Sequence, residues 1–199
     1  MPQTGRRLPL EQGPGGEDML LFLAEFEGDA GAICPRRLLH RTLDRAAGMG
    51  YDVYAALEYE FFMFRETPHS VRAKHYRNME NWTPGNFGYS MLRSTVEGDF
   101  YRKLLDMCER MDMPIEGLHT ETGPGVLEAA IAVDQAAAAG DKAFLFKTFT
   151  KALAQQNGLM ATFMAKWSHD HPGQSGHIHL SLREKKSGRS AFYLSLIHI

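Results

Sequence analysis

The clearest alternation of apolar and polar positions lies in the stretch YDVYAALEYEFFMF, at residues 51–64. It is rich in aromatic and β-branched residues and is long enough for a buried strand. Side chains alternate faces along a strand, so Glu58 and Glu60 share one face with Phe62 and Phe64. Two carboxylates in so apolar a strand are costly to bury without positive charge. The pattern therefore predicts either a solvated face or a site that gathers cations.

Similar patterns predict the other elements. We expect a helix from Pro35 to the glycines at 48 and 50, a second from a capping box of Ser94 and Glu97 to about Met111, and a third over 135–158 capped by Asp134. Strands are expected at 18–27, 114–121, 125–133, 159–167, 175–184 and 189–194, with turns at 122–125 and 185–188.

Up to residue 184, the predicted order of elements is β-α-β-α-β-β-α-β-β, which indicates an α+β fold with neighbouring antiparallel strands rather than a doubly wound sheet. Residues 1–17 are glycine, proline and charge, and are interpreted as a flexible arm. One incomplete domain is expected over 18–194. The apolar residues 195–199 are interpreted as a non-native or truncated tail.

Composition narrows the possible partners. The 199 residues carry a net charge of −2 and no long basic run, so neither nucleic acid nor an anionic membrane is expected as a partner. Cys34 and Cys108 form no Cys-x-x-Cys motif, which fits a reducing cytosol. No signal peptide or apolar run of membrane-spanning length is apparent, so a cytoplasmic location is expected.

Acidic residues recur in GLHTETGPGVLEAAI at 117–131. Glu116, His119 and Glu121 precede the turn, and Glu128 follows it within a small apolar strand. A lone glutamate in such a strand is unusual unless it is paired or is a ligand. The alternative is an edge strand with solvated acids.

Four histidines crowd residues 167–182, WSHDHPGQSGHIHLSL. His177, His179 and Ser181 share one strand face, whereas the two earlier loop histidines, at 169 and 171, are interpreted as ordinary polar residues. Gly173 allows close approach of the backbone. Imidazole with carboxylates suits a divalent cation. If the three segments converge, two cations would offset the acids, which indicates a metal-dependent enzyme of phosphate chemistry.

These segments resemble the glutamine synthetase superfamily, ATP-dependent ligases that join ammonia or an amine to glutamate. EYEFFMF resembles the family's Glu-x-Glu-Phe-Phe strand, and HTETGPGVLE its His-His-Glu-x-x-x-Gly-x-x-Glu segment. ATFMAKW and GQSGHIHLSL resemble its Thr-Phe-Met-x-Lys stretch and histidine strand. The resemblance covers residues 18–193 and implies part of that family's catalytic domain, with a curved, largely antiparallel sheet flanked by helices.

The resemblance also implies roles for individual residues. It places one Mg²⁺ or Mn²⁺ on Glu60, Glu121 and Glu128, and a second on Glu58 and His177. It implies contacts of ATP with Glu116, His179 and Ser181, and a glutamate contact at Gly173. It implies phosphoryl transfer from ATP to glutamate, then attack by ammonia or a primary amine. It assigns no catalytic acid or base here.

Departures from the family pattern occur at Pro172, Thr120, Val126 and Trp167, where Asn, His, Gln and Pro are common. We expect them around the amino-acid substrate, which leaves the amine acceptor open between ammonia and something larger.

The phosphate-binding arginines, the flap glutamate and the small N-terminal domain of the family are expected to be missing. The chain alone is therefore expected to show no ligase activity, and the full-length protein to form a homo-oligomeric ring. A non-catalytic relative and an unrelated two-metal phosphoryl-transfer enzyme are the alternatives.

Overall fold

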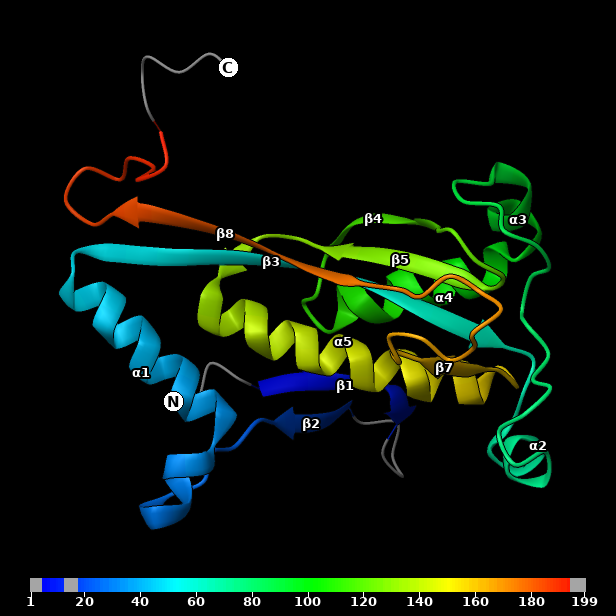
Figure 1. Cartoon of the computed structure of the whole chain (residues 1–199). Helices are drawn as coiled ribbons and strands as arrows, with labels where there is room; N and C mark the ends of the chain where they lie inside the picture. The colour runs from blue at the N-terminus through cyan, green and yellow to red at the C-terminus, as the bar shows by residue number, and fades with distance from the viewer. Residues whose placement is uncertain (1–4, 13–17, 194–199) are drawn as a thin grey trace.

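The computed structural model describes residues 5–12 and 18–193 (Figure 1). Its helices are η1 (Gly28–Ile33, a 3₁₀ helix), α1 (Pro35–Gly48), α2 (Pro68–Ala73), α3 (Met91–Val96), α4 (Gly98–Arg110) and α5 (Ala136–Gln156). Its strands are β1 (Gly5–Gln12), β2 (Asp18–Phe22), β3 (Tyr51–Phe64), β4 (Ile115–Thr120), β5 (Val126–Ile131), β6 (Asp134–Gln135), β7 (Met160–Thr162) and β8 (Gly176–Glu184). The predicted strand at 51–64 is confirmed to the residue.

β3 is the centre of the main sheet, and every pairing in that sheet is antiparallel. β5 and β6 pair with one edge of β3, and β4 continues the sheet beyond β5. β8 and β7 pair with the other edge. This is the α+β architecture that the sequence predicts, with strands distant in sequence joined through one long strand.

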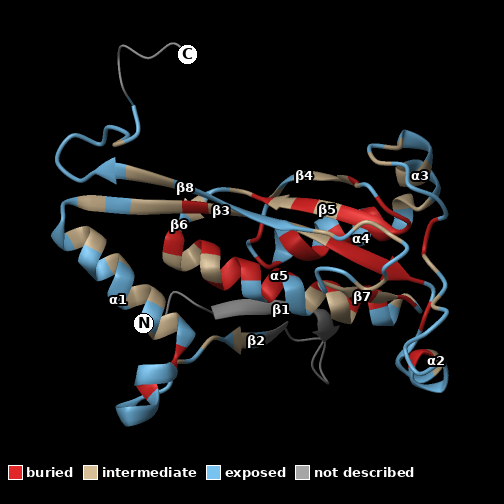
Figure 2. Cartoon of the chain, viewed as in Figure 1, coloured by how far each residue is buried: buried red, intermediate tan, exposed pale blue. Residues whose placement is uncertain are grey.

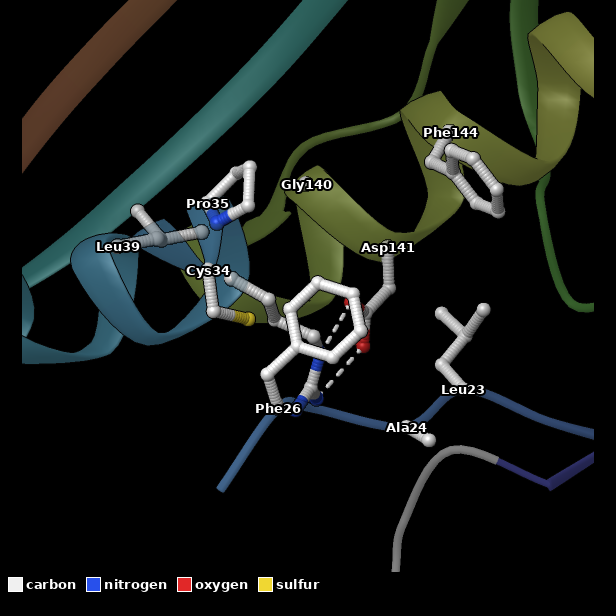
Figure 3. Close-up of a pocket in the computed structure, with 10 residues that line it drawn as sticks. Leu23, Ala24, Phe26, Cys34, Pro35, Leu39, Gly140, Asp141 and Phe144 are labelled. Carbon is white, nitrogen blue, oxygen red and sulfur yellow. Dashed lines mark hydrogen bonds and ion pairs between the residues drawn. The ribbon is translucent and has the colours of Figure 1, made fainter. Parts of the chain in front are cut away.

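One face of β3 packs against helices. Phe61 and Met63 are fully buried in a core built with α4 and α5, and the predicted stripe of Leu145, Phe149 and Leu153 on α5 packs into the same core. The earlier part of this face, at Ala55, packs against α1 and the start of α5. Figure 2 shows the buried positions concentrated on β3, β5 and the side of α5 that meets the sheet. The apolar half of the alternation in 51–64 therefore forms the core.

The opposite face of β3 is divided along its length. At the end of the strand, Phe62 and Phe64 are covered by Trp167, whose ring lies 4.9 Å from that of Phe64. At the turn between β4 and β5, Gly125 has φ +70°, and a Cβ there would approach the carbonyl oxygen of Met63 to 2.5 Å. The turn can therefore lie this close beside the backbone of the strand only with glycine. Earlier on the same face, Glu58 and Glu60 lie outside this apolar cover.

Several element boundaries were predicted wrongly. Within residues 1–17, where an arm is expected, the structure describes β1, which pairs antiparallel with β2, and β2 ends at Phe22 rather than at residue 27. The strand expected at 159–167 is limited to β7. In the segment expected to form a strand at 189–194, the structure gives only a bridge from Ser190 to Arg183, and residue 194 and the tail 195–199 are outside the described residues.

The helix caps also differ from the prediction. Ser90 caps α3, and its Oγ accepts a hydrogen bond from the Arg93 N–H, whereas Ser94 lies within that helix. Glu97 is the N-cap residue of α4. Asp134 belongs to β6 and pairs with Lys142 at 2.7 Å. Side chains predicted to cap a helix can instead interact with another backbone group or with a charged residue. The spacing of residues along the sequence does not reveal such partners.

No helix in the described part of the chain is long and apolar enough to cross a membrane.

Candidate metal centre

The register of four strands gathers the predicted carboxylates and imidazoles on one face of the sheet. Glu58 is directly opposite His177 of β8 on one side and Ala130 of β5 on the other. Two residues further along β3, Glu60 is opposite Glu128 of β5, and Glu128 is opposite His119 of β4. Residues opposite each other in an antiparallel sheet share a face and have Cβ atoms about 5 Å apart. The alternation predicted from the sequence therefore produces two adjacent polar rows.

The first row is built around the Glu58 carboxylate. Its Oε2 lies 3.2 Å from Nδ1 of His177 and 3.2 Å from Nε2 of His179. Hydrogen bonds from His179 and then His177 hold the pKa of Glu58 below its ordinary value, against the opposing effect of burial. Both rings are more than half exposed. Glu58 is therefore ionised at neutral pH and already close to two imidazole nitrogens.

The second row begins with Glu60. Its carboxylate accepts a hydrogen bond from the Ser175 N–H and another from the Ser175 hydroxyl, each at 2.9 Å. Ser175 ends the loop before β8, so these bonds fasten the loop to the sheet. A cavity of about 470 Å³ opens beside them, lined by Glu60, Glu121, Thr122 and residues 172–175.

Three side chains that could bind a metal ion lie close together at the other end of this row. His119, Glu121 and Glu128 each offer an atom within 4.8 Å of the others. Burial raises the pKa of Glu121, but hydrogen bonds from Tyr89 and Thr122 outweigh it and leave that pKa lowered. Burial raises the pKa of Glu128, and the charges of Glu58, Glu60 and Glu121 raise it further, against the opposing effect of His119.

This donor set fits a divalent cation. Carboxylate oxygens suit Mg²⁺ and Mn²⁺, and imidazole suits Zn²⁺. A bound cation would also offset the repulsion that contributes to the raised pKa of Glu128. The tight cluster contains His119, which sequence reasoning did not assign, whereas the Glu60 carboxylate is directed to Ser175. The alternation that puts His119 and Glu121 on one strand face was the signal that could have found it.

The remaining predicted residues are placed less closely. Ser181 is opposite Tyr54, two positions beyond His179 along β8. Glu116 is exposed at the point where the register of β4 and β5 shifts. Gly173 lines the cavity beside Glu60, and a Cβ there would come within 2.9 Å of the carbonyl oxygen of Ala165. His179 and Ser181 thus continue the polar face of β8, and Glu116 is not drawn into it.

Tyr89 is a site residue that the sequence did not predict. It has φ +55°, its ring centroid lies 4.7 Å from that of His119, and it bonds Glu121. It follows a loop without periodicity, so no pattern pointed to it. The Tyr89 and Ser90 N–H groups bond the carbonyl and hydroxyl oxygens of Thr120, which fixes the loop against β4.

The departures from the family pattern prove to have different surroundings. Pro172 lines the cavity beside Glu60. Val126 and Trp167 instead pack with Phe62 and Phe64 in an apolar cluster, and Thr120 is buried where it anchors the 89–90 loop. Three of the four substitutions therefore concern packing around the site.

Comparison with known proteins agrees with this arrangement. The family model described as "Glutamine synthetase, catalytic domain" matches residues 32–196. The chain belongs to this family. It is 39% identical over 192 residues to type-1 glutamine synthetase 2 of Dictyostelium discoideum, a match that covers 95% of this chain and 36% of the relative.

The names of two other relatives indicate that those proteins act on amines other than ammonia. Glutamate–isopropylamine ligase of a Pseudomonas species is 32% identical over 83% of this chain and 36% of its own length. Gamma-glutamylethanolamide synthetase GlnA4 of Streptomyces coelicolor is 34% identical over 96% of this chain and 40% of its own length. The chain thus spans about two fifths of the curated relatives that it matches.

Solved structures show the same fold. GmaS without ligand superposes with a TM-score of 0.79 at 24% identity, over 96% of this chain and 43% of that one. Plasmodium falciparum glutamine synthetase gives 0.77 at 18% identity, over 96% and 41% of the two chains. At these identities the comparison establishes the glutamine synthetase fold and no more.

Proposed function

We propose that this chain forms part of an ATP-dependent ligase that joins glutamate to ammonia or a primary amine. The observation that carries the proposal is the convergence of Glu58, Glu60, Glu121, Glu128 and His177 on one sheet face, in a chain of the glutamine synthetase family. A sheet whose strands are otherwise largely apolar has no structural need for so many acids on one face. We infer that they hold divalent cations.

In this proposal, Glu60, Glu121 and Glu128 hold one Mg²⁺ or Mn²⁺, with His119 close by. Glu58 and His177 hold a second. Divalent cations supply the positive charge that offsets the phosphates during phosphoryl transfer. Glu60 would also keep the loop at Ser175 in place through its two hydrogen bonds.

The substrates are proposed to lie around these rows. His179 and Ser181 on β8, with Glu116 on β4, are proposed to contact ATP, and the cavity at Gly173 is proposed to hold glutamate. The γ-phosphoryl group passes to the glutamate side-chain carboxylate, and ADP leaves. The amine nitrogen then attacks the acyl carbon, phosphate leaves with the bonding electron pair, and the nitrogen loses a proton.

The names of the isopropylamine and ethanolamide relatives support an acceptor larger than ammonia. Pro172 supports it as well, because proline at the cavity wall has neither the amide side chain nor the N–H of the usual asparagine. Both observations concern the part of the site where the two substrates would meet.

Metal binding tests the proposal without requiring turnover. Titration of the chain with Mn²⁺, with free ion followed by electron paramagnetic resonance, is expected to show two bound ions. Glu128→Gln and Glu58→Gln are each expected to weaken one of them by about 100-fold or more, because even residues behind the ligands contribute 10–100-fold. ADP is expected to raise the melting temperature only with Mn²⁺ present.

Glu184→Gln is the matched control, since Glu184 is an exposed carboxylate at the end of β8. It is expected to bind Mn²⁺ like the wild type. A chain that binds no more Mn²⁺ than a Glu58→Gln, Glu128→Gln double variant would be a non-catalytic relative, and the proposal would be wrong.

A further inference from the structure

A second cavity lies next to the metal centre. It has a volume of about 610 Å³ and lies between α3, the start of α4 and β4. Its lining includes His119 and Tyr89, and also Ser94 and Tyr101. His119 belongs to the cluster with Glu121 and Glu128, and Tyr89 bonds Glu121. The cavity therefore adjoins the second polar row directly.

The two cavities have linings that are related through one carboxylate, that of Glu121. The first, at Gly173, contains Glu121 in its wall, and the second contains the two residues that contact Glu121 or cluster with it. A ligase must bring two substrates to one acyl carbon from different directions. If the first cavity holds glutamate, the second offers the amine a space beside residues that contact the same carboxylate.

We propose that the cavity between α3 and α4 receives the substituent of a primary amine, a short uncharged alkyl or hydroxyalkyl group. This inference rests on the proposed ligase function and adds the class of acceptor. The ammonium end of the amine lies toward Glu121, where negative charge is concentrated, and the substituent extends past Tyr89 and His119.

The lining of the cavity agrees with a neutral substituent. Met91 and the Tyr101 ring supply apolar surface, and Ser90, Ser94 and Thr95 supply hydroxyl groups. None of the described residues that line it carries a carboxylate, so a second ammonium group would find no counter-charge there.

Arg102 is the one permanently charged residue of the lining, and it is already paired with Asp99. A carboxylate on the substituent would compete with this pair. Ammonia would leave the cavity unfilled, because it has no substituent to place there. The chemistry thus favours amines of the size of ethanolamine and isopropylamine.

Gly98 offers a way to fill the cavity with little cost to folding. It lines the cavity at the first position of α4. A Cβ added there would meet only the Arg102 Nη1 atom within 4 Å, at 3.2 Å, which is the end of an exposed side chain. Gly98→Phe is therefore expected to fold and to occupy the space, and Thr95→Phe does the same from an exposed position of α3.

The experiment is a titration of the ¹⁵N-labelled chain with isopropylamine hydrochloride and with ethanolamine hydrochloride, followed by amide shifts in the presence and absence of diamagnetic Mg²⁺. We expect shifts at residues 89–102 and at His119 that an equal concentration of ammonium chloride does not produce. Gly98→Phe and Thr95→Phe are each expected to weaken amine binding by about tenfold or more. Mn²⁺ binding is expected to remain as in the wild type.

Gly48→Phe is the matched control. Gly48 ends α1, does not line the cavity, and a Cβ there meets nothing within 4 Å. It is expected to leave the amine titration unchanged. Shifts that ammonium chloride reproduces, or variants that bind both amines like the wild type, would overturn the inference while Mn²⁺ binding stands. Loss of Mn²⁺ binding in the wild type would instead overturn the proposed function.

Discussion

Glu66, directly after β3, and Glu128, in β5, both have carboxylates that are largely shielded from solvent. The first is surrounded by hydrogen-bond donors and the second by other acids. Glu66, 1% exposed, follows β3 and receives hydrogen bonds from Lys74 Nζ at 2.6 Å, the Ser70 hydroxyl at 2.5 Å and the Glu80 N–H at 2.9 Å. Glu128, whose side chain is 15% exposed, has His119 at 4.0 Å and three other carboxylates in its surroundings.

The pKa values follow these surroundings. Burial raises the pKa of Glu66, but the bonds from Lys74, Ser70 and Glu80 outweigh burial and leave it lowered. Burial and like charges leave the pKa of Glu128 raised. A carboxylate fully satisfied by its own chain stabilises the fold, whereas one surrounded by other acids lacks a positive partner. The difference separates structural acids from those expected to bind a ligand.

The largest expected effect is on Glu66. Glu66→Ala is expected to lower the free energy of unfolding by about 2–4 kcal/mol, because it leaves an ammonium, a hydroxyl and an N–H without their partner. Urea unfolding at neutral pH in EDTA measures it. Asp106→Ala, which removes an exposed carboxylate paired with Arg110, is the control and is expected to cost less than about 1 kcal/mol. Equal losses of unfolding free energy in Glu66→Ala and Asp106→Ala would contradict the interpretation of Glu66 as a structural acid.

Glu128→Gln is expected to act in the opposite direction. Without metal it should raise the free energy of unfolding by up to about 1 kcal/mol, because it removes a like charge directly opposite Glu60. The same urea experiment in EDTA measures it. A destabilisation as large as that of Glu66→Ala would show that Glu128 supports the fold like a structural acid.

The smallest expected effect is a difference in pH dependence. The lowered pKa of Glu66 makes its contribution present above the unfolded pKa and lost as pH falls through the folded pKa. The raised pKa of Glu128 means that the metal-free protein loses stability as pH rises from the unfolded pKa through the folded one.

Urea unfolding of the metal-free protein between about pH 3 and pH 7 tests both signs. The deficit of Glu66→Gln relative to the wild type is expected to close toward the acid end. The advantage of Glu128→Gln is expected to appear as pH rises above about 4 and to level off above the folded pKa. A Glu128→Gln advantage that is largest in acid would contradict the assignment of repulsion to this residue.

Much of the fold could be predicted from local pattern. The period of two in residues 51–64 predicted both faces of β3, and the period of four at Leu145, Phe149 and Leu153 predicted the buried stripe of α5. The predicted element boundaries were wrong where a segment or side chain interacts with a partner other than the expected one, whether that partner is distant or near in sequence. Asp134 was expected to cap α5 but pairs with Lys142, and β1 became a strand because β2 pairs with it.

Most residues of the candidate site were found for the same reason. Glu58 and Glu60 stood out because they interrupt an apolar face, and Glu128 because it interrupts a small apolar strand. Tyr89 was missed because it lies in a loop with positive φ and no periodicity. His119 was noticed but not assigned, because its importance depends on the strand that lies beside it.

The sequence by itself determined which side chains lie on the polar face of each strand, because alternation is a property of the extended backbone. Only the tertiary structure decided which strands are neighbours and in what register. It placed Glu60 opposite Glu128 and Glu58 opposite His177, over separations of 68 and 119 residues. The physical reason is that the register is fixed by burying the apolar face of β3 on α4 and α5, and a slip of one residue would turn every carboxylate toward that core.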